Sequence, residues 1–228
     1  MKILIVAATW LEVSIFADEL EFVGETSQMV KKYRFEDSEI DILVTGIGLT
    51  FTTFHLTNVL KSQNYNLVIN AGIAGSLTKE LEIGEVVSVV SDEFGDLGIE
   101  KEEDFLTLFE SGFMDSGEYP FTNGLLRTTD ANMITGFRKV RGITVNKSHG
   151  RNDSISEIKT KFPAQVESME GAAVFYVCNW LGVDCLQLRA ISNYVEPRET
   201  AFWNIPLALE KLSESVLGVL RKLPVAVA

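Results

Sequence analysis

Short runs of apolar residues alternate along the chain with stretches in which apolar residues recur every three or four positions. The first run covers residues 3–8, and apolar residues at helical spacing follow it in residues 10–20. Such patterns predict a strand followed by an amphipathic helix. The further predicted strands are residues 40–44, 67–70, 86–90, 142–145 and 185–191, and the further predicted helices are residues 51–60, 153–161, 170–181 and 204–222.

This alternation of strands and helices indicates the fold class. Strands that are apolar throughout are covered on both faces, which is typical of parallel sheets. We therefore expect an α/β fold with three layers, α/β/α, around a central mixed, mainly parallel twisted sheet. No repeat or low-complexity linker divides the sequence, and its length suits one domain over residues 1–228. Residues 92–124 lack a clear period and are expected to form a long excursion.

The charge balance limits the partners. The 228 residues include 20 Lys and Arg against 32 Asp and Glu, a formal net charge of −12. An acidic chain without clustered basic residues offers no surface for a polyanion, so we expect neither nucleic acid nor an anionic membrane as a partner. Acidic residues soon follow the apolar start, and no apolar run reaches about 18 residues, so neither a signal peptide nor a membrane span is predicted. A cytoplasmic protein is expected.

The usual metal and cofactor motifs are missing from the sequence. Cys178 and Cys185 lack the C-x-x-C spacing and are expected to be buried apolar residues. His55 and His149 are too few for a histidine-rich metal site. Residues 46–48 read G-x-G without the third glycine of a dinucleotide fingerprint, and neither a phosphate loop nor a nucleophile elbow occurs. We expect no metal and no cofactor.

The ends of the predicted strands carry two carboxylates and an amide. Ligands of parallel α/β sheets bind at the carboxyl ends of strands, so we expect the site in the loops there. Glu12, Glu170 and Asn193 lie in these loops, but each also has a structural interpretation: Glu12 completes a T-x-x-E capping box, Glu170 opens a helix and Asn193 is an ordinary turn residue. The loops are residues 9–12, 46–48, 72–76, 168–170 and 192–198.

Seven segments, in this order, resemble the landmarks of the nucleoside phosphorylase and nucleosidase superfamily. They are Met1-Lys2-Ile3, Glu12-Val13, Asn70-Ala71-Gly72-Ile73-Ala74-Gly75, Ser91-Asp92-Glu93, Phe162-Pro163, Met169-Glu170-Gly171-Ala172-Ala173 and Arg189-Ala190-Ile191-Ser192-Asn193. The resemblance extends from residue 1 to about residue 220. It is closest to the 5′-methylthioadenosine/S-adenosylhomocysteine nucleosidases and the futalosine hydrolases, and residues 193–198 resemble the second branch.

The resemblance implies cleavage of the N-ribosidic bond of a purine nucleoside. Glu12 would activate water, and Glu170, beside Met169, would bind the ribose hydroxyls and favour a cationic transition state. Adenine-specific members carry an Asp that protonates purine N7, where this chain has Asn193, an amide that cannot act as an acid. A carboxamide can donate toward O6 and N7 of a 6-oxopurine, which favours hypoxanthine without excluding adenine.

The expected reaction is therefore hydrolysis of futalosine to hypoxanthine and dehypoxanthinyl futalosine, a step of menaquinone biosynthesis. The resemblance also implies a homodimer or larger homo-oligomer, in which residues 113–121 could reach a neighbouring subunit.

An adenine-releasing nucleosidase and a non-catalytic purine nucleoside-binding protein remain open as alternative functions. Phosphorolysis is disfavoured because the first-strand loop holds a carboxylate and no Arg.

Further residues are expected to bind the substrate. The set is Gly72, Ile73, Met169, Ser192 and Arg198. Arg198 has the planar fork that pairs with a carboxylate such as the benzoate of futalosine, and Phe202 or Trp203 could supply aromatic surface, although an exposed Arg and packed aromatics are an equal alternative. Residues 146–149 are expected to form the base-stacking wall, and Arg189 could be a paired structural residue.

Overall fold

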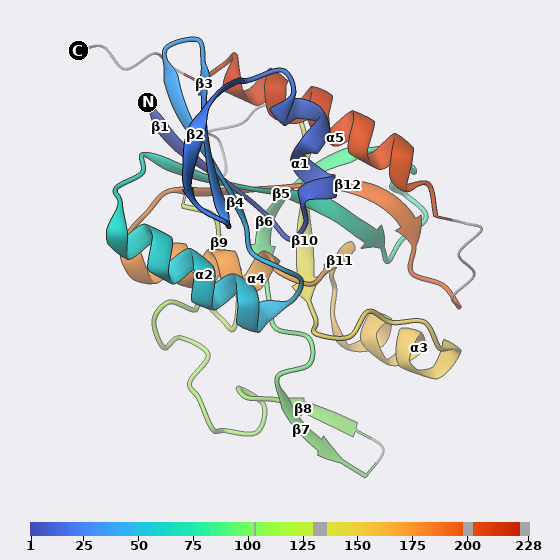
Figure 1. Ribbon diagram of the computed structural model, residues 1–228. Helices are drawn as coiled ribbons and strands as arrows, with labels where there is room; N and C mark the ends of the chain where they lie inside the picture. The colour runs from blue at the N-terminus through green and yellow to red at the C-terminus, as the bar shows by residue number, and fades with distance from the viewer. Residues whose placement is uncertain (103, 130–135, 198–202, 224–228) are drawn as a thin grey trace.

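The computed structural model describes residues 1–102, 104–129, 136–197 and 203–223, arranged as in Figure 1. The strands are β1 (Lys2–Ala7), β2 (Glu21–Ser27), β3 (Val30–Phe35), β4 (Ser38–Val44), β5 (Leu67–Ser76), β6 (Val86–Asp92), β7 (Gly98–Lys101), β8 (Asp104–Thr107), β9 (Leu126–Arg127), β10 (Arg138–Thr144), β11 (Val166–Ser168) and β12 (Cys185–Tyr194). The helices are α1 (Trp10–Ala17), α2 (Leu49–Ser62), α3 (Asn152–Lys161), α4 (Gly171–Leu181) and α5 (Ile205–Leu220).

Parallel pairing forms the centre of the main sheet. There β12, β5, β1 and β4 lie side by side, and each is parallel to its neighbour. Beyond β4, the strands β3 and β2 continue the sheet in antiparallel pairing. On the other side, β6 is antiparallel to β12, whereas β10 and β11 continue in parallel. The expected α/β fold with a mixed sheet is confirmed, but antiparallel pairs are too prominent for a mainly parallel sheet.

The short strand β11 closes part of this sheet into a ring. It pairs with β10 on one side and antiparallel with β5 on the other, through Val166 with Ser76 and Glu167 with Gly75. The strands β5, β12, β6, β10 and β11 therefore form a closed, barrel-like set. A single sheet between two helical layers, as the sequence analysis predicted, does not describe this ring. The closure depends on a long-range pairing of two residue pairs, which leaves no periodic signal in the sequence.

Helices cover both faces of the sheet. In Figure 1, α1 and α5 lie on one face, and α2 and α4 lie on the opposite face. Successive residues of a strand point to alternate faces. Ile3 and Ile5 of β1 accordingly pack in the core under α1 and α5, and Leu4 and Val6 pack in the core over α2 and α4. This burial on both sides explains why β1 is apolar throughout.

Two hairpins, β2 with β3 and β7 with β8, were not predicted. The side chains of β2 are exposed along nearly its whole length, so they lack the apolar alternation of a half-buried strand. In the excursion, β7 and β8 form a separate two-stranded sheet, visible at the bottom of Figure 1. The other end of the excursion packs onto the domain, since Phe121 is buried in its core and its ring lies 6.1 Å from that of Tyr176 on α4.

The expectations for cysteines, metals and membranes can be compared with the described residues. Cys178 and Cys185 are buried and free, as predicted. His55 lies on α2, with its ring edge-on to Phe54. In the described part of the chain, no group of three or more His, Cys, Asp or Glu side chains is placed to hold a metal. None of the described helices is both long and apolar enough to cross a bilayer.

Candidate active site

The predicted strand-end loops meet at one place in the fold. The loop after β1 reaches β5 through a hydrogen bond from Ile73 N to Glu12. The loop after β11 reaches the start of α2 through a hydrogen bond from Gly48 N to Glu170. The end of β12 reaches β5 through Ser192 Oγ, 3.3 Å from the Ala74 carbonyl oxygen. The carboxyl ends of these strands thus bring the candidate residues together, as the sheet topology requires.

Glu12 joins the first turn of α1 to β5. Its Oε2 atom accepts a hydrogen bond from Thr9 N at 3.0 Å, which is the capping interaction expected from the T-x-x-E pattern. Its Oε1 atom accepts from Ile73 N at 3.1 Å, a residue far away in sequence. The side chain is buried. Glu12 therefore combines two contacts, because one oxygen caps the helix and the other accepts from β5.

Gly72 makes the site possible through its missing side chain. A Cβ atom at this position would lie 2.2 Å from Arg189 Nη1 and 2.8 Å from Glu12 Oε1. Real Cβ contacts are never so short, so any side chain at position 72 would displace the guanidinium, the carboxylate or both. Gly72 and Ile73, predicted as substrate-binding residues, thus both lie against Glu12.

Glu170 lies at the N-terminus of α4 and points toward another helix. Its Oε1 atom accepts a hydrogen bond from Gly48 N at 3.0 Å, and Gly48 is the residue before α2. Its Oε2 atom lies 3.9 Å from Arg189 Nη2. Gly48 has a φ of 98°, a conformation that favours glycine. The G-x-G segment that failed as a dinucleotide motif therefore supplies a backbone donor to the site.

The electrostatics show that the two carboxylates act on each other. Burial raises the pKa of Glu170, the guanidinium of Arg189 opposes this rise, and the charge of Glu12 adds to it. Two carboxylates and one guanidinium leave the group with a net negative charge when all three are ionised. Such a group favours a positive charge in a bound ligand.

Arg189 is a site residue that the sequence analysis left undecided. It is 1% exposed and lies on β12, paired in register with Gly72 of β5. With the Asn70 carboxamide oriented to satisfy its neighbours, Arg189 Nη2 also donates to the Asn70 oxygen at 2.8 Å. The signal in the sequence is a charged residue in the middle of an apolar strand, since a buried guanidinium requires partners of opposite charge.

Asn193 lies further along the same strand pair, next to Gly75. A bulge in β12 between Ile191 and Asn193 brings Asn193 opposite Gly75. Ser192 Oγ donates to Asn193 Oδ1 at 2.8 Å, and Asn193 Nδ2 donates to the Tyr194 carbonyl oxygen at 2.9 Å. Gly75 is three residues beyond Gly72, or about 10 Å along a strand. The amide is thus placed beside the carboxylate group, at the distance of a neighbouring subsite.

The other predicted residues have different outcomes. Met169 is half-buried and precedes Glu170 directly. Trp203 is also half-buried. Arg198, the predicted partner of a substrate carboxylate, and Phe202, a predicted source of aromatic surface, lie outside the described residues. The loop of residues 146–149 lies next to β11, where His149 contacts Glu167.

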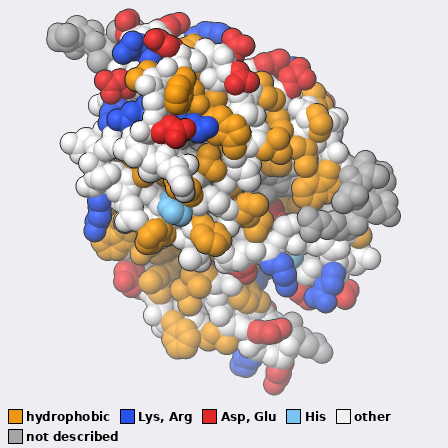
Figure 2. Space-filling model, in the orientation of Figure 1, with side chains coloured by type: hydrophobic (Ala, Val, Ile, Leu, Met, Phe, Trp, Pro, Cys, Tyr) orange, Lys and Arg blue, Asp and Glu red, His pale blue; other side chains and the backbone are white. Residues whose placement is uncertain are grey.

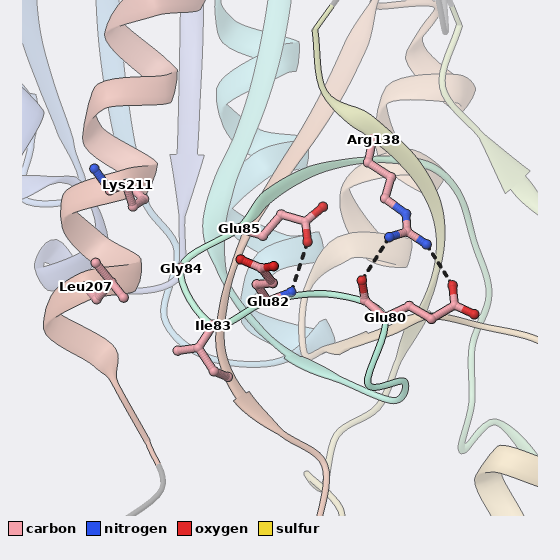
Figure 3. Close-up of a pocket in the computed structure, with 8 residues that line it drawn as sticks. All are labelled: Glu80, Glu82, Ile83, Gly84, Glu85, Arg138, Leu207 and Lys211. Carbon is pink, nitrogen blue, oxygen red and sulfur yellow. Dashed lines mark hydrogen bonds and ion pairs between the residues drawn. The ribbon is translucent and has the colours of Figure 1, made fainter.

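The structure also has a cavity of about 550 Å³ that is not built from predicted site residues. Figure 3 shows that Glu80, residues 82–85, Arg138 and the α5 residues Leu207 and Lys211 line it. The cation Arg138 in its lining is paired, because it donates to the carbonyl oxygen of Glu80 at 2.9 Å and to its carboxylate at 2.7 Å. We therefore assign the chemistry to the strand ends and not to this cavity.

A fold with helices on both faces of a mixed sheet, and paired carboxylates at its strand ends, agrees with the resemblance drawn from the sequence. The chain belongs to the phosphorylase superfamily, whose family model matches residues 2–223. A futalosine hydrolase of Streptomyces coelicolor is 32% identical over 182 residues, which cover 77% of this chain and 76% of the relative.

Two further comparisons extend the relationship. A 5′-methylthioadenosine/S-adenosylhomocysteine nucleosidase of Glaesserella parasuis is 28% identical over 231 residues, covering 96% of this chain and 98% of the relative. The native structure of futalosine hydrolase of Helicobacter pylori superposes with a TM-score of 0.81 at 19% sequence identity, covering 98% of each chain. At this identity the structural match supports the fold.

Proposed function

We propose that this protein is a nucleosidase that hydrolyses the N-glycosidic bond of futalosine and releases hypoxanthine and dehypoxanthinyl futalosine. The similarity to the futalosine hydrolase of Streptomyces coelicolor supports this substrate. The observation that carries the proposal is the amide at position 193. The resemblance drawn from the sequence implies an Asp at this position in the superfamily members that release adenine.

The neighbours of Asn193 orient its carboxamide for a 6-oxopurine. Its oxygen already accepts from Ser192 Oγ, and one of its N–H groups donates to the Tyr194 carbonyl oxygen. An amide nitrogen has two donors, so one N–H is left for the base. A donor matches O6 and N7 of hypoxanthine, which are both acceptors, whereas adenine presents a donor at N6.

Glu12 is the proposed general base for the attacking water. Thr9 N and Thr9 Oγ1 donate to Oε2, and Ile73 N donates to Oε1, so the carboxylate is fixed between the helix and β5. Oε1 keeps a further lone pair that can accept from water. A positioned base of this kind contributes roughly 10²- to 10⁴-fold to a rate.

Glu170 is proposed to bind the ribose hydroxyls and to stabilise the cationic sugar of the transition state. The carboxylate is buried, and charges interact more strongly in such surroundings than in water. Arg189 acts as a positioning residue, because its guanidinium lies 3.9 Å from Glu170 and, like the Glu12 carboxylate, borders the space above Gly72. Gly72, Ile73, Met169 and Ser192 complete the proposed binding site, together with Arg198 for the substrate carboxylate.

The charge of the site favours water over phosphate as the nucleophile. A phosphate ion needs several cationic or N–H donors around it. The described residues of the site offer one guanidinium between two carboxylates, so a phosphate dianion would meet net repulsion. We therefore propose hydrolysis and not phosphorolysis.

One residue argues against each of the two alternative functions. An adenine-releasing nucleosidase is the second candidate, since relatives of that activity cover nearly the whole chain; Asn193 is the feature against it. A protein that binds purine nucleosides without turnover is the third candidate. The position of Glu12, which suits a base for water, argues against a protein that only binds.

A direct test is incubation with futalosine, inosine, 5′-methylthioadenosine and S-adenosylhomocysteine in buffer without phosphate. Chromatography then identifies the released base. We expect hypoxanthine from futalosine as the dominant activity, with no increase in rate when phosphate is added. Dominant release of adenine would refute the substrate, and a requirement for phosphate would refute hydrolysis.

We further propose a homodimer or larger homo-oligomer of one-domain subunits that works in the cytoplasm. Figure 2 shows hydrophobic side chains gathered on the face that carries α1, α2 and the excursion. Phe51, Phe54, Phe113 and Tyr119 are all more than half exposed, whereas Phe121, also in the segment expected to reach a neighbour, is buried in its own chain. A contact that covers exposed aromatics is favourable. A monomer in light scattering would refute this assembly.

A further inference from the structure

A largely buried pair of a histidine and a carboxylate has no part in the chemistry described so far. His149 Nδ1 lies 2.5 Å from Glu167 Oε2, and His149 N donates to Glu167 Oε1 at 3.0 Å. The two side chains are only 12% and 5% exposed. Both oxygens of Glu167 thus bind one residue, which fixes the position of the imidazole ring.

The strand β5 connects this pair to Asn193. Gly75 of β5 pairs with Glu167 on one side and with Asn193 on the other. Directly paired residues point to the same face of a sheet, and a Cβ atom at Gly75 would lie 3.3 Å from Asn193 Nδ2. Glu167 and Asn193 therefore flank the same face of β5, about 10 Å apart across two strand spacings. A purine with a polar partner on each edge fits such a span.

One nitrogen of His149 is available to a ligand. Nδ1 faces Glu167, so only Nε2 can reach another group. Nowhere in the described ranges does Nε2 have a hydrogen-bond partner. A histidine whose Nδ1 is bound by a carboxylate and whose Nε2 is free has the arrangement in which this side chain transfers protons.

The proposed reaction needs a proton donor on the side of the base. When the bond between C1′ and N9 breaks, its electron pair passes to the purine, which leaves more readily if it gains a proton. Asn193 can donate a hydrogen bond but not a proton. Glu12 and Glu170 belong to the group around Gly72, further back along β5.

We propose that His149, held by Glu167, is the acid that protonates the departing purine; this inference rests on the proposed function. Water oxygen bonds to C1′ and gives a proton to Glu12. The electron pair of the C1′–N9 bond passes to the purine, and a ring nitrogen of the purine takes the Nε2 proton of the imidazolium. The products are neutral hypoxanthine, the free sugar, protonated Glu12 and neutral His149. Glu12 then loses its proton to solvent, and His149 regains one from solvent.

The test compares two leaving groups in the variant His149→Gln. One substrate is futalosine, and the other is its 8-aza analogue, in which nitrogen replaces C8–H and makes the purine a better leaving group of the same size. Loss of an acid should lower kcat for futalosine by on the order of 100-fold, with little change in KM, and should lower kcat for the analogue far less. An equal loss on both substrates, or no loss on futalosine, would overturn the proposal.

Two further variants separate this role from folding. His55→Gln changes the other histidine of the chain, on α2, and should leave both rates unchanged. Glu167→Gln keeps the shape of the partner but removes its charge, so it should also slow futalosine more than the analogue. If thermal unfolding shows that His149→Gln is unfolded, Glu167→Gln tests the proposal instead. The quantity compared is again the loss of kcat on futalosine relative to the loss on the analogue. Wild-type protein that releases no hypoxanthine would instead refute the proposed function.

Discussion

The guanidinium of Arg189 occupies the space that a side chain at Gly72 would need. A Cβ atom at position 72 would lie 2.2 Å from Arg189 Nη1. The two residues are paired in register on β12 and β5, so their backbones cannot move apart without disturbing the sheet. The missing side chain therefore leaves room for a fully buried cation next to Glu170 and for the carboxylate of Glu12.

The variant Gly72→Ala should be nearly inactive although it adds a single methyl group. The methyl displaces Arg189 and Glu12, and a misplacement of about 1 Å in a catalytic group lowers a rate on the order of 100-fold. The measurement is kcat/KM for futalosine. Gly218→Ala is the matched control, because nothing lies within 4 Å of a Cβ there and the residue is inside α5. Wild-type activity in Gly72→Ala would contradict the role of this contact.

The variant Glu12→Gln should lose turnover and keep ligand binding. The amide has nearly the same shape but cannot take a proton from water, so kcat should fall by roughly 10²- to 10⁴-fold. Calorimetry should still detect binding of futalosine, with a Kd within a few-fold of the wild type. Glu19→Gln, an exposed residue beyond α1, serves as the control. Unchanged turnover in Glu12→Gln would exclude Glu12 as the base.

The variant Asn193→Asp should shift the choice of base toward adenine. A carboxylate accepts from the N6 amino group of adenine and, when protonated, can donate to N7, but it repels O6 of hypoxanthine. The rate of adenine release from 5′-methylthioadenosine, relative to hypoxanthine release from futalosine, should rise roughly 10- to 100-fold. Asn64→Asp, at an exposed position, should leave this ratio unchanged. A constant ratio in Asn193→Asp would show that position 193 does not select the base.

Asp92 should make the stability of the protein depend on pH. This fully buried carboxylate accepts hydrogen bonds from Gln187 Nε2 at 3.0 Å and from Thr144 Oγ1 at 2.9 Å. Burial raises its pKa from 3.8 to about 6, although both hydrogen bonds and the charge of Arg189 oppose the rise. The folded protein thus binds this proton more tightly than the unfolded chain does.

The free energy of unfolding should therefore fall as the pH rises through the window from 3.8 to about 6. The contribution of Asp92 to this fall is about 3 kcal/mol. Urea unfolding at several pH values measures it, and the variant Asp92→Asn should lack this part of the pH dependence. Asp37→Asn, at an exposed position, should keep it. Identical pH dependence in wild type and Asp92→Asn would disprove this assignment.

The elements that could be predicted are those whose burial leaves a local pattern of apolar residues in the sequence. The predicted strand at residues 67–70 is the first part of β5, and the predicted helix at residues 170–181 agrees with α4 to within one residue. The prediction ended β5 too early, because Gly72 and Gly75 have no side chains to continue an apolar run. The closure of β11 onto β5 and the exposed hairpin of β2 and β3 depend on long-range pairing, which periodicity does not record.

The candidate site could be predicted only in part for a related reason. Glu12 and Glu170 were recognised through the family resemblance, since a capping box and a helix start explain them equally well. Gly48 contributes a backbone N–H, which any residue has, so its role depends on the fold. Arg189 was visible as a charge in an apolar strand, but its carboxylate partner Glu170 is brought to it by another loop.

The most direct test of the account is a comparison of two values of kcat/KM in phosphate-free buffer. One is for release of hypoxanthine from futalosine, and the other is for release of adenine from 5′-methylthioadenosine. The account predicts that futalosine is preferred by at least about tenfold, because the free N–H of Asn193 meets two acceptors, O6 and N7, on hypoxanthine, whereas adenine offers it N7 beside the N6 donor. A preference for 5′-methylthioadenosine would contradict it.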